Sequence, residues 1–121
     1  MPFQYTLANL LAKNQGALAV LFLDETGETV DLACAEYTPY EMKVVGAYVG
    51  IYMRQMAEVS VAAGLGQVDV LHIEKDEIHL FAAVLPDGYY LVLVQTRPSL
   101  TAHSQRTLLE ARDEIAREIF G

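Results

Sequence analysis

The stretch GALAVLFLD, residues 16–24, decides the fold. From residue 17 onward, apolar side chains occupy both alternating faces, with leucine, valine and phenylalanine on one and alanine and leucine on the other. A strand that is apolar on both faces is typical of the middle of a sheet with covering layers on both sides. The sequence therefore predicts a central strand here and helices on both faces of its sheet.

The segments around this strand complete its first hairpin. Phe3, Leu7, Leu10 and Leu11 follow helical spacing, so a short helix should precede the strand and end near residues 14–16. Residues 25–27, with a glycine that tolerates positive φ, predict a turn. Residues 28–34 return as a more polar strand that suits a sheet edge.

The second half of the chain begins with a strong helix start. Thr38 stands at an N-cap position, Pro39 at the first helical position and Glu41 three residues after the cap. The helix should run to about Ala63 and stop at the glycines that follow. Strands are expected over residues 67–74, 77–85 and 89–96, with turns at 75–76 and 86–88, and then a helix over 99–120. The order α-ββ-α-βββ-α predicts one domain over residues 1–121, an α+β sandwich on an antiparallel sheet.

Composition narrows the possible functions. Sixteen acidic residues against eight basic ones give a net charge of −8, which argues against nucleic acids and anionic bilayers as partners. The single cysteine excludes a disulfide framework and suits a reducing compartment. No signal peptide is recognisable, and the apolar run over residues 17–23 is too short for a membrane span. We expect a soluble cytoplasmic protein.

The long middle helix carries apolar residues in too many directions. At about 100° per residue, one apolar face is expected to pack on the sheet, and a second strip carries glycine and alanine. The residues expected on the sheet side are Val45, Tyr48, Val49, Tyr52, Met56 and Val59. Gly46 and Gly50 each cost up to about 1 kcal/mol in a helix, so a close backbone approach is expected there. The approaching backbone is either the same helix of a second subunit or a neighbour within the chain, such as a loop.

A second feature favours a dimer. Residues 67–74 contain Val68, Val70, Leu71 and Ile73, an apolar set for a strand left at a sheet edge. Pairing two copies across a twofold axis would cover this edge and bring the two helices together. The predicted dimer interface is Gly46, Gly50, Met53, Ala57, Val68 and Val70.

The order and spacing of these segments resemble the Roadblock/dynein light chain family over essentially the whole chain. The opening residues 16–24 with Thr26-Gly27-Glu28, the long middle helix, the three-strand meander and the strand at residues 90–94 carry the resemblance. It implies a five-stranded antiparallel sheet in the order 2-1-5-4-3 and a homodimer through the third strand and the middle helix. Family members bind small Ras-like GTPases or act as dimeric adaptors. The bacterial relatives most similar to this chain regulate the GTPase that sets cell polarity and gliding direction.

The resemblance suggests a regulatory module without an active site of its own. We expect a homodimer that binds a small Ras-like GTPase through Lys43, Ala47, Arg54 and Glu58, with GTPase activation or another effect on the nucleotide cycle. Only Gly121 follows Phe120, whereas related activators often extend further, so binding is better supported than activation. The alternatives are a dimeric structural adaptor without GTPase contact and a small-molecule sensor or enzyme.

Residues with chemical potential have simpler explanations. The chain contains no P-loop sequence for nucleotide phosphates. His72 and His79, paired across a turn at 75–76 with Glu74 and Glu77, could hold zinc or form an ordinary solvated hairpin face. Cys34 is interpreted as a small core residue rather than a nucleophile. Arg54 could act as an arginine finger or pair with Glu58.

A hydrolytic pair is the last possibility. Ser99, Ser104 and His103 lie near the final helix, but capping explains these serines better. We expect no catalysis by this chain, no cofactor and no metal.

Overall fold

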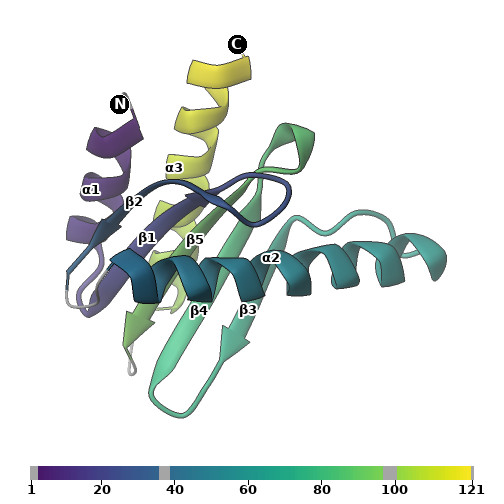
Figure 1. Cartoon of the computed structure of the whole chain (residues 1–121), viewed down its shortest axis with the longest axis horizontal. Coiled ribbons are helices and arrows are strands. Elements are labelled where there is room, and N and C mark those ends of the chain that lie inside the picture. The colour runs from purple at the N-terminus through teal and green to yellow at the C-terminus, as the bar shows by residue number, and fades with distance from the viewer. Residues whose placement is uncertain (1–2, 36–38, 97–100, 121) are drawn as a thin grey trace.

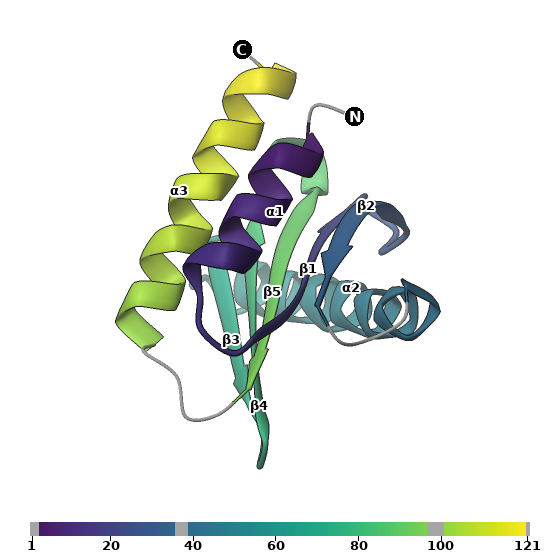
Figure 2. The same cartoon turned by 90° about the vertical axis from the view of Figure 1, so that its left-hand side faces the viewer.

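The computed structural model describes residues 3–35, 39–96 and 101–120. A five-stranded antiparallel sheet in the order β2-β1-β5-β4-β3 is covered by α2 on one face and by α1 and α3 on the other (Figures 1 and 2). The elements are α1 (Phe3–Lys13), β1 (Ala17–Leu23), β2 (Thr29–Cys34), α2 (Pro39–Ala62), β3 (Val70–Glu74), β4 (Ile78–Val84), the short 3-10 helix η1 (Pro86–Gly88), β5 (Tyr90–Thr96) and α3 (Thr101–Phe120). This confirms the predicted fold class, the order of elements and the strand order.

The two central strands divide their side chains between two cores. Val20, Phe22, Leu91 and Leu93 belong to the core beneath α1 and α3. Their neighbours along the chain, among them Leu21 and Val92, belong to the core beneath α2. All are fully buried, as the doubly apolar pattern of residues 16–24 predicts.

Several boundaries differ from the prediction. β3 begins at Val70 rather than at residue 67, because Gly64 and Gly66 both adopt positive φ after α2 and the chain joins the sheet later. The predicted cap Thr38 and the first two residues of the predicted last helix, Ser99 and Leu100, lie outside the described residues.

The register of the β3–β4 hairpin is also different. The Lys75 amide donates to the Ile78 carbonyl oxygen (2.9 Å), and Glu74 lies opposite His79, not opposite Glu77 as predicted. The real pairing is shifted by two residues, which returns every side chain to the same face. Alternation of apolar and polar residues therefore could not distinguish the two registers.

Within the part of the chain that the structure describes, no helix has both the length and the apolar character needed to cross a bilayer.

Candidate interaction surface

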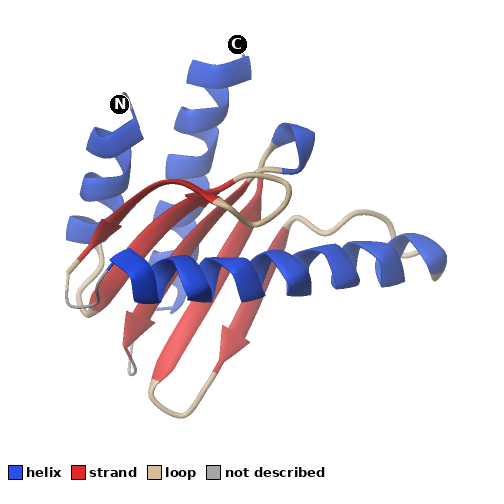
Figure 3. Cartoon of the chain, in the orientation of Figure 1, coloured by secondary structure: helices blue, strands red, loops and turns tan. Residues whose placement is uncertain are grey.

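Helix α2 is longer than the sheet beneath it is wide. Its 24 residues span roughly 36 Å, while five strands spaced about 4.8 Å apart span roughly 19 Å. The helix crosses the strands from the β2 side, and its C-terminal part projects beyond β3 (Figure 3). A large part of its surface therefore meets no other element of the chain.

The side of α2 that faces the sheet carries the glycines. Its buried residues are Met42, Gly46, Val49, Gly50 and Met53. A Cβ atom on Gly46 would come within 2.9 Å of the Leu23 Cδ2 atom, and one on Gly50 within 2.8 Å of the Gly27 Cα atom. At Gly50 the close backbone approach that the sequence predicts is present, but the approaching backbone is the β1–β2 turn of the same chain, and at Gly46 the neighbours are leucine side chains of β1.

This corrects part of the predicted interface. Gly46, Gly50 and Met53 are buried against their own sheet and are not available to a second subunit. Assigning the glycines to a dimer contact was wrong. The alternative of a loop within the chain is correct for Gly50, whereas Gly46 packs on side chains of β1. Small residues mark the packed face of this helix because only they let its axis lie close to the turn.

The opposite face of α2 is apolar and exposed. Tyr48, Ile51, Tyr52, Met56 and Val59 have exposed fractions between 39% and 58%. The prediction placed four of them, Tyr48, Tyr52, Met56 and Val59, against the sheet, and the structure contradicts this. Soluble monomers rarely expose a contiguous apolar patch of this kind, so the outward face of α2, defined by these five residues, is the strongest candidate for a contact surface.

The two edges of the sheet differ in their protection. At β2, the Gln4 amide donates to the Leu32 carbonyl oxygen (2.8 Å) and to the Asp31 Oδ1 atom (2.7 Å). The same Asp31 oxygen accepts from the Leu32 amide (2.9 Å). Gln4 and Asp31 thus occupy the carbonyl and amide groups of Leu32, which an added strand would have to pair with. Natural proteins protect the edge strands of their sheets from pairing with another chain in similar ways.

At the other edge, β3 combines apolar and polar positions. Val70, Leu71 and Ile73 are half-buried, and His72 and Glu74 are exposed. Of the remaining predicted interface residues, Ala57 and Val68 are half-buried and line a pocket of about 250 Å³ between α2 and the loop that precedes β3. The predicted residues outside the α2–sheet contact thus gather on the β3 side of the molecule.

The predicted GTPase-facing residues lie along another side of α2, beside the β1–β2 turn. Lys43 and Ala47 line a shallow depression of about 310 Å³ together with Gly27, Glu28 and Thr29. The Arg54 guanidinium donates through Nη1 to the Glu25 carbonyl oxygen (3.1 Å), and Glu58 is exposed. Arg54 therefore fastens α2 to the turn, a role that the predicted pairing with Glu58 did not anticipate.

The β1–β2 turn is itself ordered by one carboxylate. Asp24 Oδ1 accepts hydrogen bonds from the Thr26 hydroxyl (2.7 Å), the Thr26 amide (2.9 Å) and the Glu28 amide (3.0 Å). The Thr26 hydroxyl bond, with the backbone amides, lowers the pKa of Asp24 against the opposing effect of burial. The turn that contacts Gly50 is thus internally braced.

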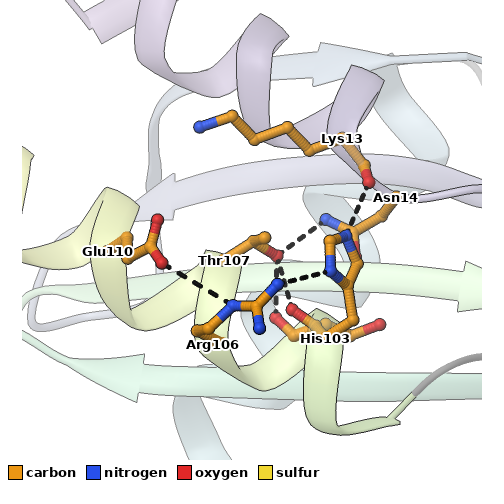
Figure 4. A network of polar contacts seen from close by, with 7 residues as sticks. Lys13, Asn14, His103, Arg106, Thr107 and Glu110 are labelled. Atoms are coloured by element: carbon orange, nitrogen blue, oxygen red, sulfur yellow. Dashed lines mark hydrogen bonds and ion pairs between the residues drawn. The ribbon is translucent and has the colours of Figure 1, made fainter.

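Residues considered for nucleophilic chemistry have structural roles. Burial raises the pKa of the Cys34 thiol, which disfavours the reactive thiolate. The buried Ser104 hydroxyl donates to Gln95 Oε1 (2.6 Å). His103 Nε2 lies 2.9 Å from the Lys13 carbonyl oxygen, which only accepts, so Nδ1 is the acceptor for Arg106 (3.0 Å; Figure 4). His103 joins α3 to the end of α1 and does not face Ser104 as a catalytic base.

The two histidines of the β3–β4 hairpin do come together. His72 Nε2 and His79 Nδ1 are 3.4 Å apart, and Glu74 approaches His79, whereas Glu77 lies at the turn. Over residues 3–35, 39–96 and 101–120, no group of three or more histidine, cysteine or acidic side chains is arranged to hold a metal ion.

Comparison with known proteins identifies the architecture. Neither a protein-family model nor a curated protein matches the chain. Among solved structures, a Roadblock/LC7 domain from Streptomyces avermitilis has a TM-score of 0.88 at 13% identity, with 97% of each chain covered. Myxococcus xanthus MglB has a TM-score of 0.86 at 13% identity, covering 97% of this chain and 94% of that one. The gliding protein MglB from Thermus thermophilus has a TM-score of 0.84 at 16% identity, covering 95% and 86%. The chain has the Roadblock/LC7 fold.

Proposed function

We propose that this chain is a homodimeric regulatory module that binds a small Ras-like GTPase and has no active site of its own. The observation that carries the proposal is the apolar outward face of α2. The expectation of a GTPase partner comes from the Roadblock resemblance, and similarity to a gliding protein is consistent with a role in motility or polarity.

The dimer is argued from exposed surface and from the sheet edges. Burying apolar surface contributes roughly 25 cal/mol per Å², so covering five large side chains on each of two copies gives a substantial driving force. Gln4 and Asp31 protect the β2 edge, which leaves β3 as the edge for pairing. A twofold axis beside β3 would place the projecting part of each α2 next to the partner's helix.

The GTPase would contact the polar side of α2 and the braced turn beside it. Lys43 and Glu58 are exposed, and Lys43 and Ala47 line the depression next to Gly27. A rigid surface of this kind regulates by binding one arrangement of the GTPase's mobile segments more tightly than another. The dimer offers the surface twice, with the axis between the copies.

The dimer is tested by a charge on the outward face. Met56→Glu should convert the protein to a monomer in sedimentation velocity at micromolar concentration, because an interface would bury the new carboxylate without a partner. Gln105→Glu, at an exposed position of α3 on the other face of the sheet, is the matched control and should leave the assembly unchanged. A wild-type protein that sediments as a 13.4 kDa species would refute the dimer.

The partner is tested separately. Immobilised wild-type protein should retain a small Ras-like GTPase of the same organism in one nucleotide state, and Lys43→Glu should weaken this binding while leaving the assembly intact. A dimer that retains no such GTPase in either state would overturn the GTPase proposal and favour the structural adaptor.

A further inference from the structure

Two histidines lie next to each other at the exposed edge of the sheet. His72 on β3 and His79 on β4 point to the face that α1 and α3 cover, at diagonal positions of the antiparallel pair, since His72 lies opposite Phe81 and Glu74 opposite His79. His72 is exposed, whereas His79 is only 3% exposed. One imidazole is therefore open to solvent and the other is held inside the protein.

The separation of their nitrogens fits a shared metal ion. His72 Nε2 and His79 Nδ1 are 3.4 Å apart, longer than the usual 2.7–3.2 Å of a nitrogen-donated hydrogen bond. Zinc binds imidazole nitrogen at about 2.0–2.1 Å, and two such bonds at a tetrahedral angle separate the nitrogens by about 3.3–3.4 Å. In the metal-free protein the two nitrogens share a long hydrogen bond, and a zinc ion between the rings could replace it with almost no change in their separation.

The surroundings orient both rings for this role. Glu74 Oε1 lies 3.3 Å from His79 Nε2, the nitrogen on the far side from His72. A carboxylate on the far side of a ligating histidine orients the ring and makes its other nitrogen a better metal ligand. His72 stacks on Phe81, with ring centroids 4.3 Å apart and planes at 11°.

The neighbouring polar side chain does not compete for the site. Gln95 lies opposite His79 on β5, but its amide donates to the Gln15 carbonyl oxygen (3.0 Å) and its oxygen accepts from Ser104.

We propose that His72 and His79 form a binding site for a divalent transition-metal ion of the zinc class. Imidazole is a suitable ligand for zinc, copper and nickel. Two protein ligands leave the other coordination positions to water or to a small anion, so the site should bind more weakly than a structural site with four protein ligands. A bound ion would join β3 to β4 and stiffen the edge strand. The proposal is independent of the GTPase.

Zinc titration of the untagged full-length protein tests the site. Isothermal titration with zinc chloride should give one ion per chain, and His72→Ala should weaken binding at least tenfold. The chain has three histidines, so His103→Ala is the matched control and should bind as the wild type does. Cys34→Ser should likewise retain binding, because the thiol is not a ligand.

A second readout avoids variants of His79, because its burial makes them prone to misfolding. Cobalt(II) added to the wild type should produce visible absorption bands of a tetrahedral site, and His72→Ala, which changes an exposed residue, should abolish them. Glu74→Gln should weaken zinc binding about tenfold, as loss of an orienting carboxylate does. Zinc binding that is unchanged in His72→Ala, lost in His103→Ala, or absent from the wild type at millimolar zinc would overturn the proposal.

Discussion

Replacing Gly50 with alanine tests how α2 is held on the sheet. A Cβ atom at this position would lie 2.8 Å from the Gly27 Cα atom and 3.4 Å from its amide nitrogen, both of them backbone atoms. Overpacking of this kind costs typically about 1–3 kcal/mol. The better helix propensity of alanine returns up to about 1 kcal/mol. Because the contacting atoms are backbone and adjust little, we expect a net loss toward the upper end of this difference, about 1–2 kcal/mol in the free energy of unfolding.

Urea unfolding followed by circular dichroism measures this change. Gly46→Ala is the informative comparison, because its added Cβ atom would meet the end of the Leu23 side chain, which can adjust more readily than backbone. Ala47→Gly, at an exposed position of the same helix, measures the propensity effect alone and should cost about 1 kcal/mol. If Gly50→Ala were at least as stable as the wild type and only its assembly were weakened, that result would refute a packing role for this glycine. Gly50 would then be required for the dimer contact and not for packing α2 on the β1–β2 turn.

Three further predictions concern the sheet edge, the turn and the thiol. Gln4→Ala combined with Asp31→Ala should uncover the β2 edge and produce larger, concentration-dependent assemblies in light scattering, whereas Glu25→Ala should not. Asp24→Ala removes an acceptor of three hydrogen bonds and should cost about 1 kcal/mol at neutral pH. Because the pKa of Asp24 is lowered on folding, its contribution is fully present above the unfolded pKa. The difference in stability between wild type and variant should therefore begin to shrink near about pH 4 and keep falling as the pH drops through the lower folded pKa. Cys34 should react with iodoacetamide more slowly than a small-molecule thiol at pH 8, and equal rates would contradict the burial of its thiol.

The sequence predicts the architecture well because the central strands carry two signals at once. Residues 17–23 and 90–94 are apolar on both faces, and that pattern fits a central strand with helices on both sides. Register is harder, since the alternation around His72 and His79 is the same after a shift of two residues. Only the geometry of the turn, where Lys75 pairs with Ile78, selects the real pairing.

The faces of α2 could not be separated from the sequence alone. Glycine carries no side chain to mark it as buried, so the tyrosines and Met56 looked like the core face and Gly46 and Gly50 like a separate strip. The missing information was the position of Gly27, which lies far away in the sequence and directly beneath the helix. A glycine pair four residues apart, together with a positive-φ glycine in a preceding turn, is the signal that could have indicated this contact.

The burial of Gly46 and Gly50 determines which side of α2 can meet a second copy of the chain. A helix that lies on a sheet through Gly46 and Gly50 must turn the residues on its other side outward, so Tyr48 and Tyr52 are exposed because the glycines are buried. If this outward face meets only water, Tyr52→Gln should change stability by no more than about 0.5 kcal/mol at any protein concentration. If two copies bury it, the melting temperature of the wild type should rise with protein concentration and Tyr52→Gln should remove that rise. Tyr5→Gln, which changes an equally large exposed side chain on α1, should keep it. A wild-type melting temperature that is independent of concentration across the micromolar range would show that the apolar face of α2 is not what brings two copies together.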